Sequence, residues 1–470
     1  MVAAKPAGFD GKSRSHFKRW RATLPANLSC RESDASEPPG AIPGGQTTSR
    51  QPDQGKPPLH PSRRSLRGLD WFIFFVADVQ TGFGPFVSVY LTTQHWTQID
   101  IGLVLSAGGF VALIGQMPGG ALVDAARSER TVAAIAIVAI CISALGYAVL
   151  PVFAMVLSAS ILHALASCVL GPAMAAISLG LVGHAAISVR FGRNARFASV
   201  GNGLAAAAMG ACGYLLSARA VFFVTVLLLG PALIALRMIS PAEIDPERAH
   251  GAPAPADAAR PQRARSGRTR APIKPGALMQ NKTLLTFAAC LLLFHLGNAA
   301  MLPLMGSVLT MQSSRWATLL IAACIVVPQM LVALASPWVG TWAQQWGRRP
   351  LLLIGFGALP LRGLLFALVS SPVPLVAVQL LDGVTAAMFA VMVPLVIADL
   401  TRGTGHFNLG QGIVGTFVGI GASISSTLAG FLSDRFGSPW AFAGLAGIAL
   451  AGFVAVLLLM PETRKTDEAD

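Results

Sequence analysis

The sequence GGALVDAARSER, residues Gly119–Arg130, lies between two long apolar runs. It opens with paired glycines, carries the acid Asp124 and ends in a basic, polar turn. A second stretch, GTWAQQWGRRP at Gly340–Pro350, has a similar pattern, and Gly120 and Gly340 are 220 positions apart. Two such turns, one in each half of a very apolar chain, predict a duplicated bundle of membrane helices whose halves are joined by a linker.

Composition places the chain in a membrane rather than in water. Of its 470 residues, 54% are hydrophobic and 12% are charged, whereas a soluble protein has roughly 25% charged residues. The net charge of +14 does not indicate nucleic-acid binding, because the bases fall in predicted loops and tails and not on one face. The six cysteines are scattered without CxxC or other metal-ligand spacing, so we expect buried thiols and no bound metal.

The apolar runs predict an all-α fold. Met1–Gly68 is polar and rich in Pro, Gly, Ser and Arg, so we expect a disordered cytoplasmic N-terminal tail. A helix needs roughly 20 apolar residues to cross a bilayer, and the rest of the chain holds runs long enough for twelve spans. They are placed at about 69–92, 99–120, 131–150, 152–180, 198–217, 220–239, 283–310, 316–339, 350–370, 373–400, 409–431 and 439–461.

These spans divide the chain into two bundles of six helices, at 69–239 and 283–461. Between them, Ser240–Lys282 is rich in Pro, Ala and Arg and is predicted to be a flexible cytoplasmic linker. Residues 462–470 form a C-terminal tail. Basic residues concentrate in alternate loops, which puts both termini in the cytoplasm by the positive-inside rule. The expected location is the cell membrane, for a bacterium its inner membrane.

The two turns resemble the loop between the second and third spans of the major facilitator superfamily. The motif of that family reads Gly-x-x-x-Asp-(Arg/Lys)-x-Gly-(Arg/Lys)-(Arg/Lys), and Gly120 and Asp124 match it. The second turn has Gln344 in place of the acid. It keeps Gly340, Gly347, Arg348 and Arg349, whereas the first turn departs from the motif at Ala125, Arg127, Ser128 and Glu129.

The resemblance covers roughly residues 69–461 and implies two pseudo-symmetric bundles that alternate access to a central site. It also implies that the two turns act as gating loops. Asp124 is then expected to contact the start of the eleventh span, near Asn408–Gly410, when the inner side is closed. A helix N-terminus suits a carboxylate because it has partial positive charge and free N–H groups. Arg127 or Arg130 is expected to supply a basic partner.

Ionisable groups at membrane depth are costly, which makes each a candidate for function. The superfamily resemblance implies that spans 1, 4, 7 and 10 line the central cavity. It therefore brings Asp78, His163, His295 and Asp382 around one site. For each histidine, a satisfied core residue is the alternative interpretation. Gln80 and Asn298 add neutral hydrogen-bonding groups on spans 1 and 7.

Arg362 lies at nearly the same predicted depth as Asp382, one span away, so a structural ion pair is expected. Such a pair would keep Asp382 ionised and unsuited to carry protons. Asp78 is therefore the preferred proton carrier.

These features predict a secondary transporter, most simply one that exports a small amphipathic molecule in exchange for protons. Proton-coupled uptake of a metabolite and a transporter-like sensor remain alternatives. No Walker A, HExxH or GxSxG motif occurs, so neither an enzyme nor an ATP-driven pump is expected. The expected partners are the substrate, protons and lipid, with no cofactor and no nucleic acid, and the chain is expected to act as a monomer.

Overall fold

The computed structural model describes residues 61–81, 84–217, 219–251, 275–305, 317–369 and 371–464. All of them lie in one compact unit, Pro58–Asp470. In these residues the regular secondary structure is helical, without strands, as the sequence predicts. Most of the predicted N-terminal tail, the middle of the linker and the end of the chain lie outside the described residues.

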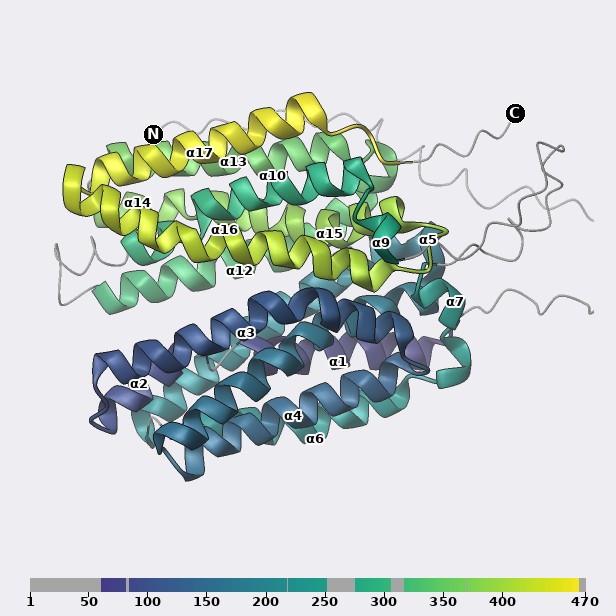
Figure 1. The fold of residues 1–470 in the computed structure, drawn as a ribbon, viewed down its shortest axis with the longest axis horizontal. Coiled ribbons are helices and arrows are strands. Elements are labelled where there is room, and N and C mark those ends of the chain that lie inside the picture. Colours follow the sequence, from purple (N-terminus) through teal and green to yellow (C-terminus); the bar gives the residue numbers. More distant parts are fainter. Residues whose placement is uncertain are drawn as a thin grey trace, which may run out of the picture. The chain divides into compact units, whose positions relative to one another are not determined.

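The helices of the two halves form two groups that lie side by side (Figure 1). The first half contains α1 (Arg63–Thr81), α2 (Gly84–Thr93), α3 (Gln98–Ala125), α4 (Glu129–Val149), α5 (Phe153–Leu215) and α6 (Ala220–Met238). The linker contributes the 3-10 turn η1 (Pro241–Glu243) and the short helices α7 (Pro246–Ala249) and α9 (Pro275–Leu278). The second half contains α10 (Lys282–Asn298), α12 (Ala317–Gln345), α13 (Arg349–Leu368), α14 (Pro372–Val378), α15 (Leu380–Thr401), α16 (Phe407–Phe436) and α17 (Ser438–Leu459).

Nine helical segments in the described ranges are long and apolar enough to cross a membrane. Local capping explains where several of them begin. The side chain of Thr97 accepts a hydrogen bond from the Asp100 N–H at the start of α3, and Asn281 accepts one from the Leu284 N–H at the start of α10. Such caps satisfy N–H groups that a helix leaves unpaired. The total of twelve spans stays a prediction.

Two boundaries differ from those predicted. Helix α1 begins at Arg63, so the last residues assigned to the disordered tail are helical. The segment 181–197, expected to be a loop, is also helical, and α5 runs from Phe153 to Leu215 with its one break at Gly183. Gly183 has φ 68° and ψ 176°, a conformation open to glycine because it lacks a Cβ. A single residue therefore makes the turn between the fourth and fifth predicted spans.

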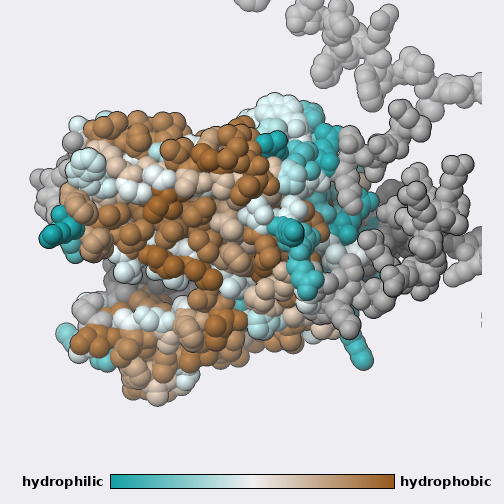
Figure 2. Space-filling view, turned by 45° about the horizontal axis from the view of Figure 1, so that its top comes forward, coloured by the Kyte–Doolittle hydropathy of each residue, from teal (hydrophilic) through white to brown (hydrophobic). Residues whose placement is uncertain are grey.

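Each half buries an aromatic core. In the first half, Tyr90 and Phe222 meet with ring centroids 5.0 Å apart, and in the second half Phe294 and Phe356 meet at 5.3 Å. Apolar side chains also cover much of the face that Figure 2 shows, whereas hydrophilic residues gather mainly at its right-hand end. Leu227, for example, is 75% exposed. An exposed apolar flank is what a lipid environment requires.

The first part of the linker packs against the first half. Ile244 and Ala249 are buried, and both lie close to Gly180 of α5. The N–H of Asp245 donates to the carbonyl of Gly180 at 3.2 Å. Residues 241–251 therefore have a defined structure within the segment expected to be a flexible tether.

Candidate functional site

Asp124 joins the two halves at the end of the molecule where the linker leaves. Its carboxylate accepts hydrogen bonds from the N–H and side-chain amide of Asn408, at 3.1 and 2.8 Å, and from the N–H of Leu409 at 2.7 Å. These groups begin α16. The sequence-based expectation of an Asp124 contact near Asn408–Gly410 is therefore confirmed. Its function as a gate remains a proposal.

The basic partner expected for Asp124 is a different one. Arg130 donates to the carbonyl of Leu236 at 3.1 Å, within the first half, and the side chain of Arg127 is exposed. The basic group near Asp124 is instead His250 of the linker, whose Nε2 lies 3.1 Å from Glu129. His250 was not predicted, because the expected base was one of the arginines within the turn and His250 lies in the linker.

The second turn makes a matching contact by different chemistry. The side-chain amide of Gln344 donates to the carbonyl of Ala185, just after the break in α5, at 3.0 Å. Arg348 stays within its own half, where its Nε lies 2.8 Å from a carboxylate oxygen of Asp399. The N–H groups of Arg348 and Arg349 donate to Glu462, which caps the start of α13.

Close backbone contacts support both cross-half bonds. A Cβ on Gly120 would collide with the backbone of Asn408, and a Cβ on Gly340 would lie 2.6 Å from the carbonyl oxygen of Ser188. Gly120 and Gly340 are 220 positions apart, and so are Ser188 and Asn408. The same pairing therefore occurs twice, with the halves exchanged. This is the relation expected of two halves related by a pseudo-two-fold axis.

A cavity lies between the halves, directly beyond this contact. Its volume is about 410 Å³. Gln116 lines it from α3 and stands four residues before Gly120, which is about 6 Å along a helix. Most of its other lining residues are alanine, valine, proline or glycine, and Asn194 and Gln411 add polar side chains. The lining comes from α1, α3, α5, α15 and α16.

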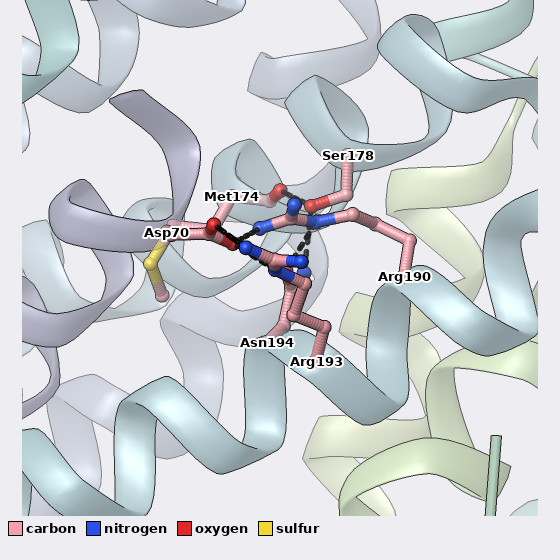
Figure 3. A network of polar contacts seen from close by, with 6 residues as sticks. All are labelled: Asp70, Met174, Ser178, Arg190, Arg193 and Asn194. Carbon is pink, nitrogen blue, oxygen red and sulfur yellow. Dashed lines mark hydrogen bonds and ion pairs between the residues drawn. The ribbon is translucent and has the colours of Figure 1, made fainter. Parts of the chain in front are cut away.

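Asn194 belongs to a polar network around the buried side chains of Asp70 and Arg190, which Figure 3 shows at close range. Arg190 donates from Nε to the side-chain oxygen of Asn194 at 2.6 Å and from Nη2 to Asp70 at 2.7 Å. Arg193 donates to both oxygens of Asp70, at 2.5 to 3.0 Å. The Asn194 amide in turn donates to Ser178 at 2.8 Å. One carboxylate thus holds two guanidinium groups, and one of these fixes an amide at the cavity wall.

This network is not among the features predicted from the sequence. Asp70 stands near the edge of the first predicted span, and Arg190 and Arg193 were placed in a loop. The usable signal was the spacing of Arg190 and Asn194, four residues apart, which aligns two polar side chains on one helix face.

The predicted pair of Arg362 and Asp382 is present. Arg362 is 2% exposed and also donates to the side-chain oxygen of Asn298 and to the Met301 sulfur. A buried guanidinium needs such partners, because an unpaired charge at membrane depth is costly. Asn298 therefore belongs to an internal cluster of the second half.

The other predicted site residues are not brought together in this state. His163 lies 3.4 Å from the Ser167 hydroxyl on its own helix, and His295 packs edge-on against Phe294. Neither histidine lines the cavity, and neither does the Arg362 cluster. The side chains of Asp78 and Gln80 lie outside the described part of the structure.

Comparisons with known proteins agree with this architecture. A family model described as the Major Facilitator Superfamily matches residues 71–361 and 288–470, and the chain belongs to that superfamily. It is a multi-pass membrane transporter by family. Two curated relatives, from two strains of Mycobacterium tuberculosis, are described as uncharacterized MFS-type transporters; each is 40% identical over 411 residues, covering 86% of this chain and 95% of the relative.

Solved structures share the fold. A human organic anion transporter matches with a TM-score of 0.58 at 17% identity, covering 85% of this chain and 100% of the other. A proton:xylose symporter bound to 6-bromo-6-deoxy-D-glucose matches with a TM-score of 0.62 at 14% identity, covering 85% of this chain and 96% of the other. The family model and the curated relatives confirm the superfamily resemblance inferred from the two turns.

Proposed function

We propose that this protein exports a small, largely apolar organic molecule across the cell membrane by alternating access, in exchange for protons. The observation that carries the proposal is the cavity between the halves, which lies next to the cross-half contacts of Asp124 and Gln344. A central cavity bounded by a breakable contact is what rocking of one half against the other requires. The expected location is the inner membrane, with both termini in the cytoplasm.

The chemistry of the cavity supports a neutral or weakly polar substrate. Among its described lining residues none is ionisable, and the polar side chains are the amides Gln116, Asn194 and Gln411. An apolar pocket with a few placed amides binds an apolar body and orients one or two hydrogen-bonding groups. A multiply charged substrate would lose its hydration there without a charged partner.

Asn194 is the amide with the best-defined orientation. Its oxygen accepts from Arg190 and its nitrogen donates to Ser178, which leaves one acceptor site and one N–H for a substrate. Asp70 holds Arg190 in turn. Asp70 and Arg190 therefore position the side-chain amide of Asn194 for its contact with the substrate.

Proton coupling is assigned to Asp78. Asp382 is paired with Arg362 in this state, and Asp70 is paired with two arginines, so both carboxylates already have cationic partners. Asp78 has no basic residue near it in its own span. An acid at membrane depth is costly, which favours Asp78 as the group that binds and releases the proton.

Dye accumulation in cells that overproduce the protein tests the substrate class. Nile red is neutral and apolar, whereas ethidium carries a fixed positive charge. Wild-type cells are expected to accumulate less Nile red than cells with Asn194→Leu, and both are expected to accumulate ethidium equally. Selective exclusion of ethidium would contradict the neutral-substrate assignment, and inward accumulation of Nile red would reverse the direction.

Reconstituted vesicles test the coupling. A pH gradient is expected to drive Nile red flux in the wild type and in Asp382→Asn protein, whereas Asp78→Asn should lose the pH-driven flux. Loss confined to Asp382→Asn would move proton binding to α15. Substrate movement that is insensitive to the gradient in all three proteins would remove proton coupling.

A further inference from the structure

The linker between the halves contributes a polar contact of its own beside the first turn. The imidazole Nε2 of His250 lies 3.1 Å from a carboxylate oxygen of Glu129, and the two side chains are 18% and 5% exposed. Glu129 begins α4 and occupies a position where the superfamily motif has a base. At this position the turn therefore carries an acid instead of the base of the motif. The acid is in the turn, and the base comes from the linker.

The backbone of the same linker residues binds the other half. The carbonyl of His250 accepts a hydrogen bond from the Phe407 N–H at 3.1 Å, and the carbonyl of Gly251 accepts one from the Gly403 N–H at 2.6 Å. Gly251 has φ +77°, and a Cβ there would lie 3.2 Å from the Cβ of Phe407. Glycine therefore allows the linker to approach α16 this closely.

The start of α16 depends on these contacts. Its N-cap residue, His406, makes no side-chain capping bond. The N–H of Phe407 is taken by His250, and those of Asn408 and Leu409 are taken by Asp124. All three donors are thus satisfied from outside the second half. Separation of the halves would break all three bonds.

We propose that His250 and Glu129 form a proton-sensitive latch that holds this side of the transporter closed. Glu129 fixes the imidazole to the first half, and the His250 and Gly251 carbonyls then reach the second half. The side chain and the backbone of residue 250 move together, so each attachment strengthens the other. Such coupling between sites is reciprocal.

The electrostatic surroundings fit this function. The interaction with Glu129, aided by the nearby charge of Asp124, raises the pKa of His250 despite its partial burial. The proton therefore stabilises the closed side at pH values below this raised pKa, and its contribution is lost as the pH rises through it. Other charged or titratable groups on the packed elements include Arg127 in the turn, Arg130 on α4, His184 on α5, Asp245, Glu247 and Arg248 on the linker, and Arg402 and His406 before α16. Asp245 and Arg248 pair with each other at 3.2 Å.

Spin-label distances test the latch without a known substrate. Ala125 and Gln345 are exposed, end α3 and α12 in opposite halves and stand 220 positions apart. Labels on Ala125→Cys and Gln345→Cys, with the native cysteines replaced, report the separation of the halves in lipid nanodiscs. In the wild type, the ratio of closed to open populations is expected to fall about three- to tenfold between about pH 5 and about pH 8, because one pKa unit corresponds to a tenfold change.

Three variants separate charge from folding. His250→Gln is expected to remove the pH dependence and favour the open side, whereas His250→Arg should remove the pH dependence and keep the side closed. Gly251→Ala should favour the open side at every pH while keeping its pH dependence. His406→Gln, a nearby histidine outside the pair, is the matched control and should titrate like the wild type.

Several outcomes would overturn the latch. They are a flat wild-type profile, an unchanged pH dependence in His250→Gln, or equal opening in His250→Gln and His250→Arg. Because the readout is a distance between the halves, it stands or fails independently of the proposed substrate and of proton coupling.

Discussion

Asp124 and Gln344 stand 220 positions apart, and each binds the opposite half of the molecule, yet one accepts hydrogen bonds and the other donates one. Asp124 takes three donors at the start of α16. Gln344 gives one donor to the carbonyl of Ala185. Hydrogen bonds to a charged group contribute about 1.5–3 kcal/mol and neutral ones about 0.5–1.5 kcal/mol. Both turns therefore make a contact with the opposite half, but the contact of Asp124 is the stronger of the two.

The comparison first requires that both turns face the same side of the membrane. Single cysteines at Thr97 and Ser371 are expected to react with an impermeant thiol reagent from outside intact cells, and cysteines at Ser128 and Gly403 are expected not to react. The positive-inside rule gives this orientation. The effect is all or none. Labelling of Ser128→Cys from outside would place the gate on the outer face.

The next largest effect is expected from the glycine contacts. Gly120→Ala places a methyl group against the backbone of Asn408, which cannot move aside as a side chain would. Transport should fall by more than about tenfold, since overpacking commonly costs about 1–3 kcal/mol. Gly340→Ala meets Ser188 at 2.6 Å and should also impair closure. The matched control is Gly109→Ala, since a Cβ at Gly109 of α3 has no neighbour within 4 Å. Wild-type flux in Gly120→Ala would show that this contact does not form during the cycle.

Substitutions of Asp124 and Gln344 should differ in how strongly they weaken closure. Asp124→Asn removes the charge and weakens three hydrogen bonds, so the closed population should fall by about ten- to a hundredfold, in line with a loss of about 1.5–3 kcal/mol. Gln344→Ala should lower it by only about two- to tenfold. Both can be measured with the spin-label pair on Ala125 and Gln345. Equal losses would mean that the carboxylate gives no advantage over the amide.

The smallest effect is expected inside the second half. Glu462 accepts hydrogen bonds from the N–H groups of Arg348 and Arg349 and so caps α13. Glu462→Gln should cost about 1 kcal/mol, as the loss of a capping acid does, and lower the thermal unfolding midpoint by a few degrees. The closed population should be unchanged, because Glu462 makes no described contact with the first half. A shift in the spin-label distances would extend the gate to the C-terminal segment.

Motifs and local periodicity predicted the elements that depend on nearby residues. The helical fold follows from the apolar runs. The Asp124 contact follows from the family motif, in which the acid of the turn meets the start of the eleventh span. The Arg362–Asp382 pair follows from equal depth in adjacent spans. Each of these expectations uses span order, which apolar runs show directly.

Other features depend on positions that local patterns do not connect. Asp70 and Arg190 are 120 residues apart, and depth estimates based on a span beginning at residue 69 put Asp70 at the membrane edge. The turn at Gly183 was missed because a single glycine among apolar residues is common in membrane helices. The amides that line the cavity carry no charge, so a search for ionisable groups passed over them.

The capping of α16 from outside its own half has a consequence for solvation. In the closed state, three N–H donors at the start of α16 and the Asp124 carboxylate have partners in one another or in the linker. Opening exposes all of these groups, and each then needs water molecules as partners. The conformational equilibrium is therefore also a hydration equilibrium. Solutes excluded from protein surfaces, such as sucrose, act on it by favouring the less hydrated, closed state.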